Sequence, residues 1–187
     1  MVIIGITGTI GAGKGTIVNY LISKKSFSHY SVREFLIKEI ILKGLPVNRD
    51  SMVIVANDLR NKFSPSYIIE QLYNEAIKNQ NNCIIESIRN VGEAEFLKKS
   101  CSFYLFAVDA NPEIRYNRIL KRKSETDKIS FVEFLENERR EMFTSDPNSQ
   151  NISECMKLAD FTFKNDDTPD ELYKQVEDTL KTIHYEH

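Results

Sequence analysis

The chain has 187 residues, of which 41% are hydrophobic and 28% are charged. This composition excludes general disorder, and the length is that of one domain. The 25 Lys and Arg residues against 27 Asp and Glu residues give a net charge of −2, which argues against a surface that coats nucleic acid or an anionic membrane. Binding of one small polyanionic ligand remains compatible with this net charge, because basic residues can still gather at one site.

The cysteines predict neither a zinc site nor a disulfide framework. Cys83, Cys101 and Cys155 lie far apart and form no C-x-x-C pair, and the histidines show no ligand spacing. The chain has no secretory signal and no apolar run of the roughly 18 residues that a membrane span needs. We therefore expect reduced thiols in a cytoplasmic protein without a membrane or nucleic-acid partner.

Short apolar runs alternate with longer amphipathic ones, which is typical of an α/β fold with a mainly parallel sheet. Strands that are covered on both faces have near-continuous apolar character. Four runs fit this description, and a weaker fifth follows the first helix: Val2–Ile6, Cys83–Ile85 continuing to Ile88, Phe103–Val108, Phe161–Phe163 and, as the fifth, His29–Ser31.

Helix starts are marked by capping residues. Ser64-Pro65, Asn111-Pro112 and Thr168-Pro169 each place a capping side chain before a proline at the first helical position. Ser130 with Glu133 has the spacing of a capping box.

Two of the stretches between predicted strands are longer than a crossover between parallel strands requires. We therefore treat residues 1–187 as a single domain with a helical insertion at about 32–80 and a smaller excursion at about 121–145.

The segment that carries the chemistry runs from Gly8 to Thr16, with the sequence GTIGAGKGT. It fits the phosphate-binding pattern G-x-x-x-x-G-K-[ST] with a shift of one position, since Gly15 precedes the hydroxyl of Thr16. An apolar run before it and a helix after it give the context that such a loop requires. The alternative is a glycine-rich turn with an incidental lysine.

We expect the loop backbone to cradle phosphates at the start of the helix. Lys14 would neutralise the β- and γ-phosphates, and Thr16 would hold Mg²⁺. The expected nucleotide-binding residues of the loop are Gly8, Gly11, Ala12, Gly13, Lys14, Gly15 and Thr16.

The G-K-G-T variant resembles the phosphate loop of the adenylate kinase and dephospho-coenzyme A kinase group of small-molecule kinases. The resemblance covers nearly the whole chain in element order. It implies a P-loop NTPase fold, with ATP and Mg²⁺ as cofactors. It further implies that the helical insertion binds the phosphate acceptor and that the excursion forms a lid.

The strand that ends in Glu86-Ser87-Ile88-Arg89 resembles the D-G-x-P-R element of nucleoside monophosphate kinases, with Glu86 in place of the aspartate. The resemblance implies that Glu86 lies near the metal and its water, and that Arg89 holds the acceptor's phosphate. A longer acid can reach a metal through water. The alternative is that both are plain surface residues at a strand end.

Arg115, Arg118 and Arg122 recur at helical spacing and share one face. By itself this pattern is explained by a solvated basic helix end. After a strand in a phosphate-loop protein it resembles the start of a mobile lid, which implies catalytic roles for Arg118 and Arg122. The segment that ends in Asn165 resembles the loop beside the adenine in dephospho-coenzyme A kinases, so Asn165 either touches the base or only forms a turn.

The acceptor site is the least specified part of the sequence. Arg33, Arg49 and Arg60 are candidates to join Arg89 on an acceptor phosphate, and Glu34 is the candidate base for a sugar hydroxyl. We favour ATP-dependent phosphoryl transfer to a (deoxy)nucleoside monophosphate. Dephospho-coenzyme A kinase-like transfer and a nucleotide-binding regulatory module without kinase activity stay open. The expected partner is the small-molecule acceptor, bound by a monomer or small homo-oligomer.

Overall fold

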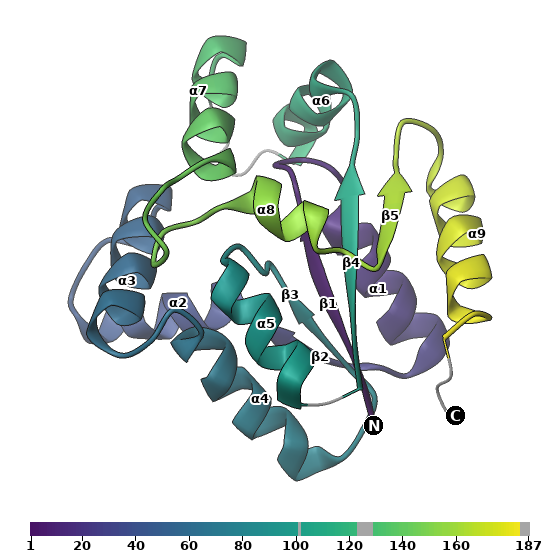
Figure 1. Cartoon of the computed structure of the whole chain (residues 1–187). Helices are drawn as coiled ribbons and strands as arrows, with labels where there is room; N and C mark the ends of the chain where they lie inside the picture. Colours follow the sequence, from purple (N-terminus) through teal and green to yellow (C-terminus); the bar gives the residue numbers. More distant parts are fainter. Residues whose placement is uncertain (101, 123–128, 184–187) are drawn as a thin grey trace.

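The computed structural model describes residues 1–100, 102–122 and 129–183. Within these ranges five strands form one sheet, in the order β2-β3-β1-β4-β5 (Figure 1). All neighbouring strands run parallel, which confirms the predicted α/β fold. The strands are β1 (Val2–Gly8), β2 (Ser28–Ser31), β3 (Cys83–Glu86), β4 (Ser102–Asp109) and β5 (Phe161–Lys164).

Helices cover both faces of the sheet, because the central strands are apolar on both sides. One face packs against α1 (Lys14–Lys25) and α9 (Pro169–Leu180). The opposite face packs against a larger set of helices. These are α2 (Val32–Leu42), α3 (Arg49–Lys62), α4 (Tyr67–Asn79), α5 (Val91–Ser100) and α8 (Ile152–Lys157).

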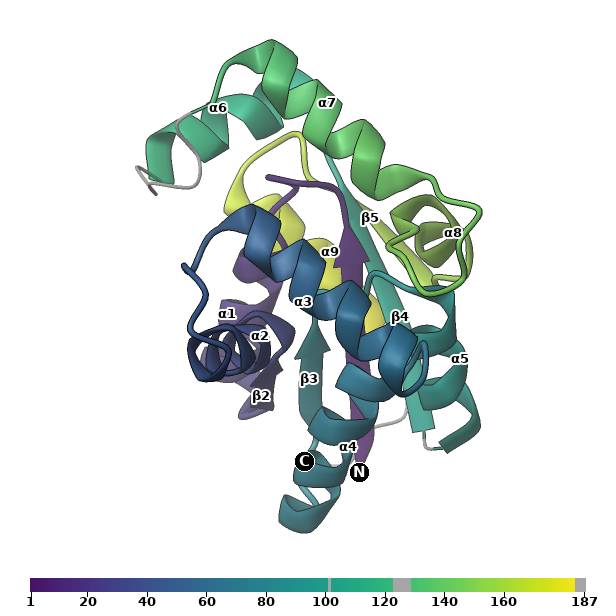
Figure 2. The same cartoon turned by 90° about the vertical axis from the view of Figure 1, so that its left-hand side faces the viewer.

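Two further helices, α6 (Pro112–Arg122) and α7 (Phe131–Met142), lie beyond the carboxyl ends of the strands (Figure 2). Parallel strands all end at the same edge, so the loops that follow β1, β3 and β4 meet there. This edge is where the chemistry-bearing segments come together. The stretch 123–128, near the start of the predicted lid, lies outside the described residues.

The predicted helix starts hold for three of the four marked helices. Helices α6 and α9 begin at their prolines, and α7 begins with the complete capping box of Ser130 and Glu133. The fourth prediction is wrong by two residues, because α4 begins at Tyr67. Ser64 and Pro65 form a preceding turn, in which the Tyr67 N–H donates to the Ser64 carbonyl at 3.1 Å.

Strand β3 ends at Glu86 and does not continue to Ile88 as expected. Ser87 has a left-handed backbone, with φ +65°, which breaks the extended run. The chain returns at once to the sheet, where the Ile88 N–H donates to the Ile6 carbonyl at 3.0 Å. This sharp turn leaves Glu86 and Ser87 at the edge where the loops meet.

None of the helices in the described part of the chain combines the length and apolar character that a membrane span requires. Cys83 and Cys155 are both buried, and burial raises the pKa of Cys155 to about 12. Cys155 therefore stays a protonated thiol at neutral pH and packs as a small apolar side chain. Cys101 lies outside the described residues.

Phe106 tests the packing of the sheet's central region. It is fully buried on β4, with its ring centroid 5.0 Å from Phe163 and 5.7 Å from Phe161. We expect Phe106→Ala to lower the free energy of unfolding by about 3–5 kcal/mol, because it removes apolar contacts and leaves a cavity. Urea denaturation measures the loss. The control is Phe143→Ala. Because Phe143 is exposed, this change should alter the free energy of unfolding by less than about 0.5 kcal/mol. Equal effects of the two changes would contradict this packing.

Candidate functional site

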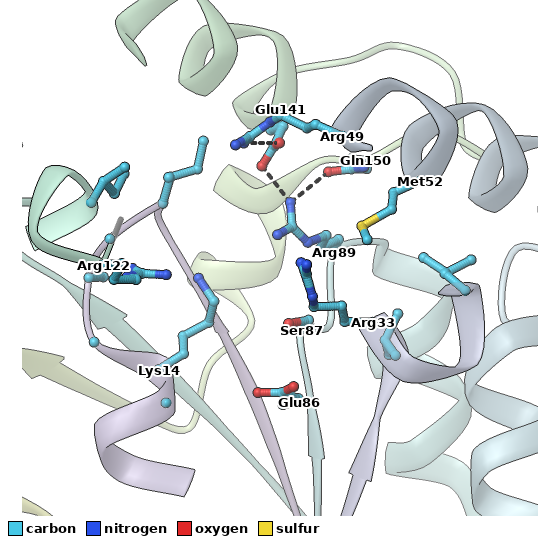
Figure 3. Close-up of a pocket in the computed structure, with 18 of the residues that line it drawn as sticks. Lys14, Arg33, Arg49, Met52, Glu86, Ser87, Arg89, Arg122, Glu141 and Gln150 are labelled. Atoms are coloured by element: carbon cyan, nitrogen blue, oxygen red, sulfur yellow. Dashed lines mark hydrogen bonds and ion pairs between the residues drawn. The ribbon is translucent and has the colours of Figure 1, made fainter. Parts of the chain in front are cut away.

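A cavity of about 800 Å³ opens where the loops after β1 and β3 face α2, α3, α6 and α7 (Figure 3). Most of the site residues predicted from the sequence line it. They are Gly11, Ala12, Gly13, Lys14, Gly15, Thr16, Arg33, Arg49, Glu86, Arg89, Arg118 and Arg122. Gly8, Glu34 and Asn165 are not among the residues that line this cavity.

The loop after β1 requires glycine at two close approaches. Gly8 has φ +136°, and a Cβ there would lie 2.0 Å from the Val108 carbonyl oxygen of β4. Gly13 has φ +103°, and a Cβ there would lie 2.2 Å from Nδ2 of Asn165. A side chain at either position would therefore meet both a strained backbone and a steric clash. Gly8 supports the loop from below, against the sheet, and does not face the cavity.

Asn165 supports the loop from outside the cavity. Its buried side-chain Nδ2 donates to the Ala12 carbonyl at 2.7 Å, and the backbone carbonyl of Asn165 accepts a 2.8 Å hydrogen bond from Nη1 of Arg118. The side chain thus holds the loop to the segment after β5. The structure therefore gives Asn165 a third role, support of the loop, which the sequence did not suggest, and Asn165 is not among the residues that line the cavity.

The start of α1 presents backbone N–H groups to the cavity, of which the Thr16 N–H already donates to the Gly13 carbonyl at 2.9 Å. Gly13 is the N-cap and supplies no side-chain hydrogen bond to the first helical turn. The other N–H groups of a first turn have no intrahelical acceptors, and the helix dipole places partial positive charge there. Because residues of this turn line the cavity, the arrangement suits a phosphate group.

Lys14 is folded back onto its own loop. Its Nζ donates to the carbonyls of Gly8 at 2.7 Å and Thr9 at 2.8 Å. Burial, and after it the positive charges of Arg89 and Arg122, lower the pKa of Lys14 to about 7. The ammonium thus lies among other cations, and an anionic ligand in the cavity would stabilise its charged form.

Glu86 lies at the end of β3 and belongs to a small polar cluster. Its Oε1 accepts a 2.9 Å hydrogen bond from the Ser31 hydroxyl and lies 3.5 Å from Nε2 of His29. Burial raises the pKa of Glu86, but the His29 and Ser31 contacts outweigh it, so the pKa falls below its usual range. The same contact raises the pKa of His29. The sequence pattern missed His29 and Ser31, since only the pairing of β2 with β3 brings them beside Glu86.

Two candidate acceptor arginines meet at one carboxylate. Glu141 of α7 binds Nη2 of Arg49 at 2.5 Å through Oε1, and it binds Nη1 of Arg89 through Oε2. Gln150 also accepts from Nη1 of Arg89, at 3.0 Å (Figure 3). Burial raises the pKa of Glu141, but Arg89 and Arg49 outweigh this effect and lower it. Sequence reasoning missed Glu141 and Gln150, because no local motif connects either to residues 49 and 89.

The three arginines of α6 have different surroundings. Arg118 and Arg122 line the cavity, and Arg122 lies beside Lys14 (Figure 3). Arg115 is buried, where it pairs with Glu138 of α7 at 2.6 Å and donates to the Ile10 carbonyl at 3.1 Å. Arg115 therefore joins the loop, α6 and α7, and only the other two remain on the cavity wall.

Two residues of the helical insertion are not placed as the sequence suggested. Glu34 is exposed in the first turn of α2, next to the N-cap Ser31, and does not line the cavity. Arg60 touches the cavity wall, but its side chain is 1% exposed and its guanidinium binds Glu93 at 2.7 and 3.1 Å. That buried ion pair joins α3 to α5, so Arg60 serves the packing. Arg33 remains exposed on the wall.

The parallel sheet, the glycine-rich loop and the lysine at the start of α1 define a P-loop protein with a kinase-like fold. A family model described as "AAA domain" matches residues 4–144, and the chain belongs to this family. Such a fold implies nucleotide binding at the loop.

Relatives and solved structures agree with this fold. A protein named UPF0200 protein from Methanococcus vannielii is 29% identical over 186 residues, which cover 98% of this chain and 97% of the relative. The shikimate kinase of Aquifex aeolicus is similar in structure, with a TM-score of 0.52, 18% identity and 96% of each chain covered. A gluconokinase of Sinorhizobium meliloti has a TM-score of 0.55 at 10% identity, with 97% of each chain covered. These structures share the fold, whereas the closer resemblance to adenylate and dephospho-coenzyme A kinases stays a prediction.

The surroundings of Lys14 lead to a test that needs no ligand. We expect its ammonium to titrate near pH 7 in the free protein. Arg89→Ala should raise this pKa, because it removes a neighbouring cation and leaves Glu141 with one fewer positive partner. NMR of ¹³C-labelled lysine measures the titration, with the Lys14 signal assigned by Lys14→Arg. Arg139→Ala, an exposed arginine of α7 outside this cavity, is the control. A midpoint above pH 10 in the unmodified protein would contradict the described burial of Lys14.

Proposed function

We propose that this protein is a small-molecule kinase, a phosphotransferase that moves the γ-phosphoryl group of ATP to a (deoxy)nucleoside monophosphate in a Mg²⁺-dependent reaction. The observation that carries the proposal is the convergence of Arg49 and Arg89 on a cavity that the phosphate loop also lines. A protein that only senses nucleotide needs the loop and a metal residue. It has no need of a second group of arginines opposite the loop.

The donor side of the cavity fits ATP. The N–H groups at the start of α1 would bind the phosphates, and Lys14 would leave its loop carbonyls to bind the β- and γ-oxygens. Arg122 stands beside Lys14 and would offset the charge that develops on the transferring group. Arg118 is anchored on the segment after β5 by the Asn165 carbonyl and would line the nucleotide side. In this proposal α6 and α7 belong to a lid over the donor.

The chemistry of the side chains also fits Mg²⁺. The described residues contain no group of three His, Cys, Asp or Glu side chains that could hold a metal on their own. Mg²⁺ keeps several waters and is usually bound by one or two protein oxygens together with substrate phosphates. Thr16 and Glu86 line the same cavity. Thr16 would contribute its hydroxyl, and Glu86 would act through a bound water.

The acceptor side combines cations with an apolar wall. Helices α2 and α3 contribute Val32, Leu36, Met52, Val53 and Ala56 to the lining, which offers apolar surface to a base. An acceptor phosphate that approaches ATP brings negative charge toward negative charge. Guanidinium groups offset that repulsion well, since they bind phosphate oxygens in pairs. Arg33, Arg49 and Arg89 line the cavity and would supply these guanidinium groups.

The transfer itself would require little from the chain beyond positioning and charge. An oxygen of the acceptor's phosphate attacks the γ-phosphorus as the bond to the bridging oxygen of ADP breaks. The acceptor oxygen is already ionised, so no general base is needed. This requirement distinguishes the proposal from transfer to a sugar hydroxyl. For that reaction the expected base was Glu34, which is exposed and away from the cavity lining.

A coupled assay for ADP release tests the activity. The unmodified protein should turn over ATP with at least one member of a panel of ribo- and deoxyribonucleoside monophosphates. Lys14→Ala should lower the rate by several powers of ten, since it removes the charge on the transferring phosphates. Circular dichroism and the melting temperature show whether the fold is intact. An active Lys14→Ala variant would overturn the proposal. Activity only on dephospho-coenzyme A would favour the hydroxyl acceptor, and tight nucleotide binding without turnover would favour a sensor.

A second test concerns the acceptor's phosphate. We expect Arg89→Ala to raise the KM for the nucleoside monophosphate about tenfold or more, which corresponds to about 1.4 kcal/mol, because a phosphate contact is lost. The KM for ATP should change far less. Arg139→Ala is the matched control. An unchanged acceptor KM in Arg89→Ala would place the acceptor elsewhere.

A further inference from the structure

Glu141 lies at the centre of a small, partly buried network that the proposed reaction does not by itself explain. Its side chain is 4% exposed. One oxygen binds Arg49, the first residue of α3, and the other binds Arg89, in the loop after β3. Glu141 itself belongs to α7, so a single carboxylate joins three segments that lie far apart in the sequence.

The two arginines keep donors that this network does not use. Arg49 Nε is buried and has no hydrogen-bond partner. Arg89 directs Nη1 to both Glu141 and Gln150. Within the described ranges no protein acceptor lies within hydrogen-bond distance of its Nε or Nη2. A donor without an acceptor away from bulk water costs free energy. An oxyanion in the cavity would supply acceptor oxygens to Nε and Nη2 of Arg89 and to Nη1 of Arg49, which Glu141 does not engage. Nε of Arg49 is enclosed by protein and lies outside this set of donors.

Without Glu141 the pair of arginines would be unstable in this geometry. Two guanidinium groups that share one site repel each other, and the repulsion is strong away from bulk water. Glu141 is held ionised by the same two arginines, so its negative charge offsets the repulsion. Because each arginine uses only one nitrogen on Glu141, the carboxylate fixes both groups and leaves part of each free.

From this geometry we propose that Glu141 is a positioning residue for the acceptor. It holds Arg49 and Arg89 from the side of α7, so that their remaining N–H groups together form a site for a tetrahedral oxyanion such as the acceptor's phosphate. This inference rests on the proposed function for the identity of the acceptor. The role of Glu141 in holding the two arginines is independent of the proposed function.

Because Glu141 belongs to α7, the packing of this helix affects both sides of the cavity. The same helix binds α6 through the ion pair of Glu138 with Arg115 at 2.6 Å, and α6 carries Arg118 and Arg122 on the donor side. An exposed pair, Arg140 with Asp50 at 3.5 Å, lies next to the Glu141–Arg49 pair. The acceptor arginines are therefore held in place only when α7 packs against α3, which links the donor and acceptor sides of the cavity.

The first experiment observes the arginines directly and needs no activity. In the protein labelled with ¹⁵N-arginine, Arg49 and Arg89 should give resolved Nε–H signals, assigned by Arg49→Lys and Arg89→Lys. Glu141→Gln keeps the size of the side chain and removes its charge, so we expect both signals to broaden or average. Glu141→Asp keeps the charge but shortens the reach by one methylene, and should retain part of the effect. Glu136→Gln, an exposed residue of the same helix, is the control and should change neither signal.

The second experiment measures binding and turnover. Orthophosphate is titrated against the same signals, and we expect the unmodified protein to bind it at least tenfold more tightly than Glu141→Gln. In the kinase assay Glu141→Gln should raise the acceptor KM at least tenfold, with the KM for ATP within about twofold of the unmodified value. A general loss of structure would raise both KM values and lower the melting temperature. If Glu141→Gln does not fold, Glu141→Asp is analysed in its place.

The outcomes separate this inference from the proposed function. Arginine signals that survive in Glu141→Gln would overturn the positioning role, and so would failure of the unmodified protein to bind orthophosphate. A lower acceptor KM in Glu141→Gln would also overturn it, since it would show that Glu141 competes with the acceptor for the arginines. Lost signals and weaker orthophosphate binding, in a protein that phosphorylates no nucleoside monophosphate, would support the positioning role and refute only the proposed acceptor.

Discussion

Positive side chains that crowd around one cavity repel one another, and the structure of this protein depends on how that repulsion is contained. Lys14, Arg49, Arg89 and Arg122 all face the same space. The consequence is measurable at Lys14, whose pKa is lowered to about 7 by burial and by its cationic neighbours. A site in this condition binds anions because an anion relieves the strain among the cations.

The carboxylates of the cavity reduce the repulsion among these cations but do not neutralise all of their charge. Glu141 is shared between two arginines, while Glu86 is engaged by Ser31 and His29 at the end of the sheet. Both are held ionised by these contacts. The two carboxylates thus lie in different parts of the cavity. Glu141 stands between Arg49 and Arg89, which we propose bind the acceptor, and Glu86 stands near the loop, where it would act on a metal-bound water in the proposed reaction.

Much of the fold could be predicted because it rests on local and repetitive signals. Continuous apolar runs predicted β1, β3, β4 and β5, since a buried parallel strand needs them. Capping residues located the starts of α6, α7 and α9. The errors arose at residues whose local sequence is compatible with two backbone conformations. Ser64 forms a turn ahead of α4, and the left-handed backbone of Ser87 ends β3 two residues early.

The sequence by itself determined the phosphate loop, because the glycines, the lysine and the flanking strand and helix are contiguous and each has a local physical reason. Only the tertiary structure decided which distant residues serve the site. It assigned Arg60 to a buried pair with Glu93 and left Glu34 on the surface. It also brought Glu141 between Arg49 and Arg89. Such choices depend on which helix packs against which, and charge partners separated by 33, 52 or 92 residues leave no periodic trace in the sequence.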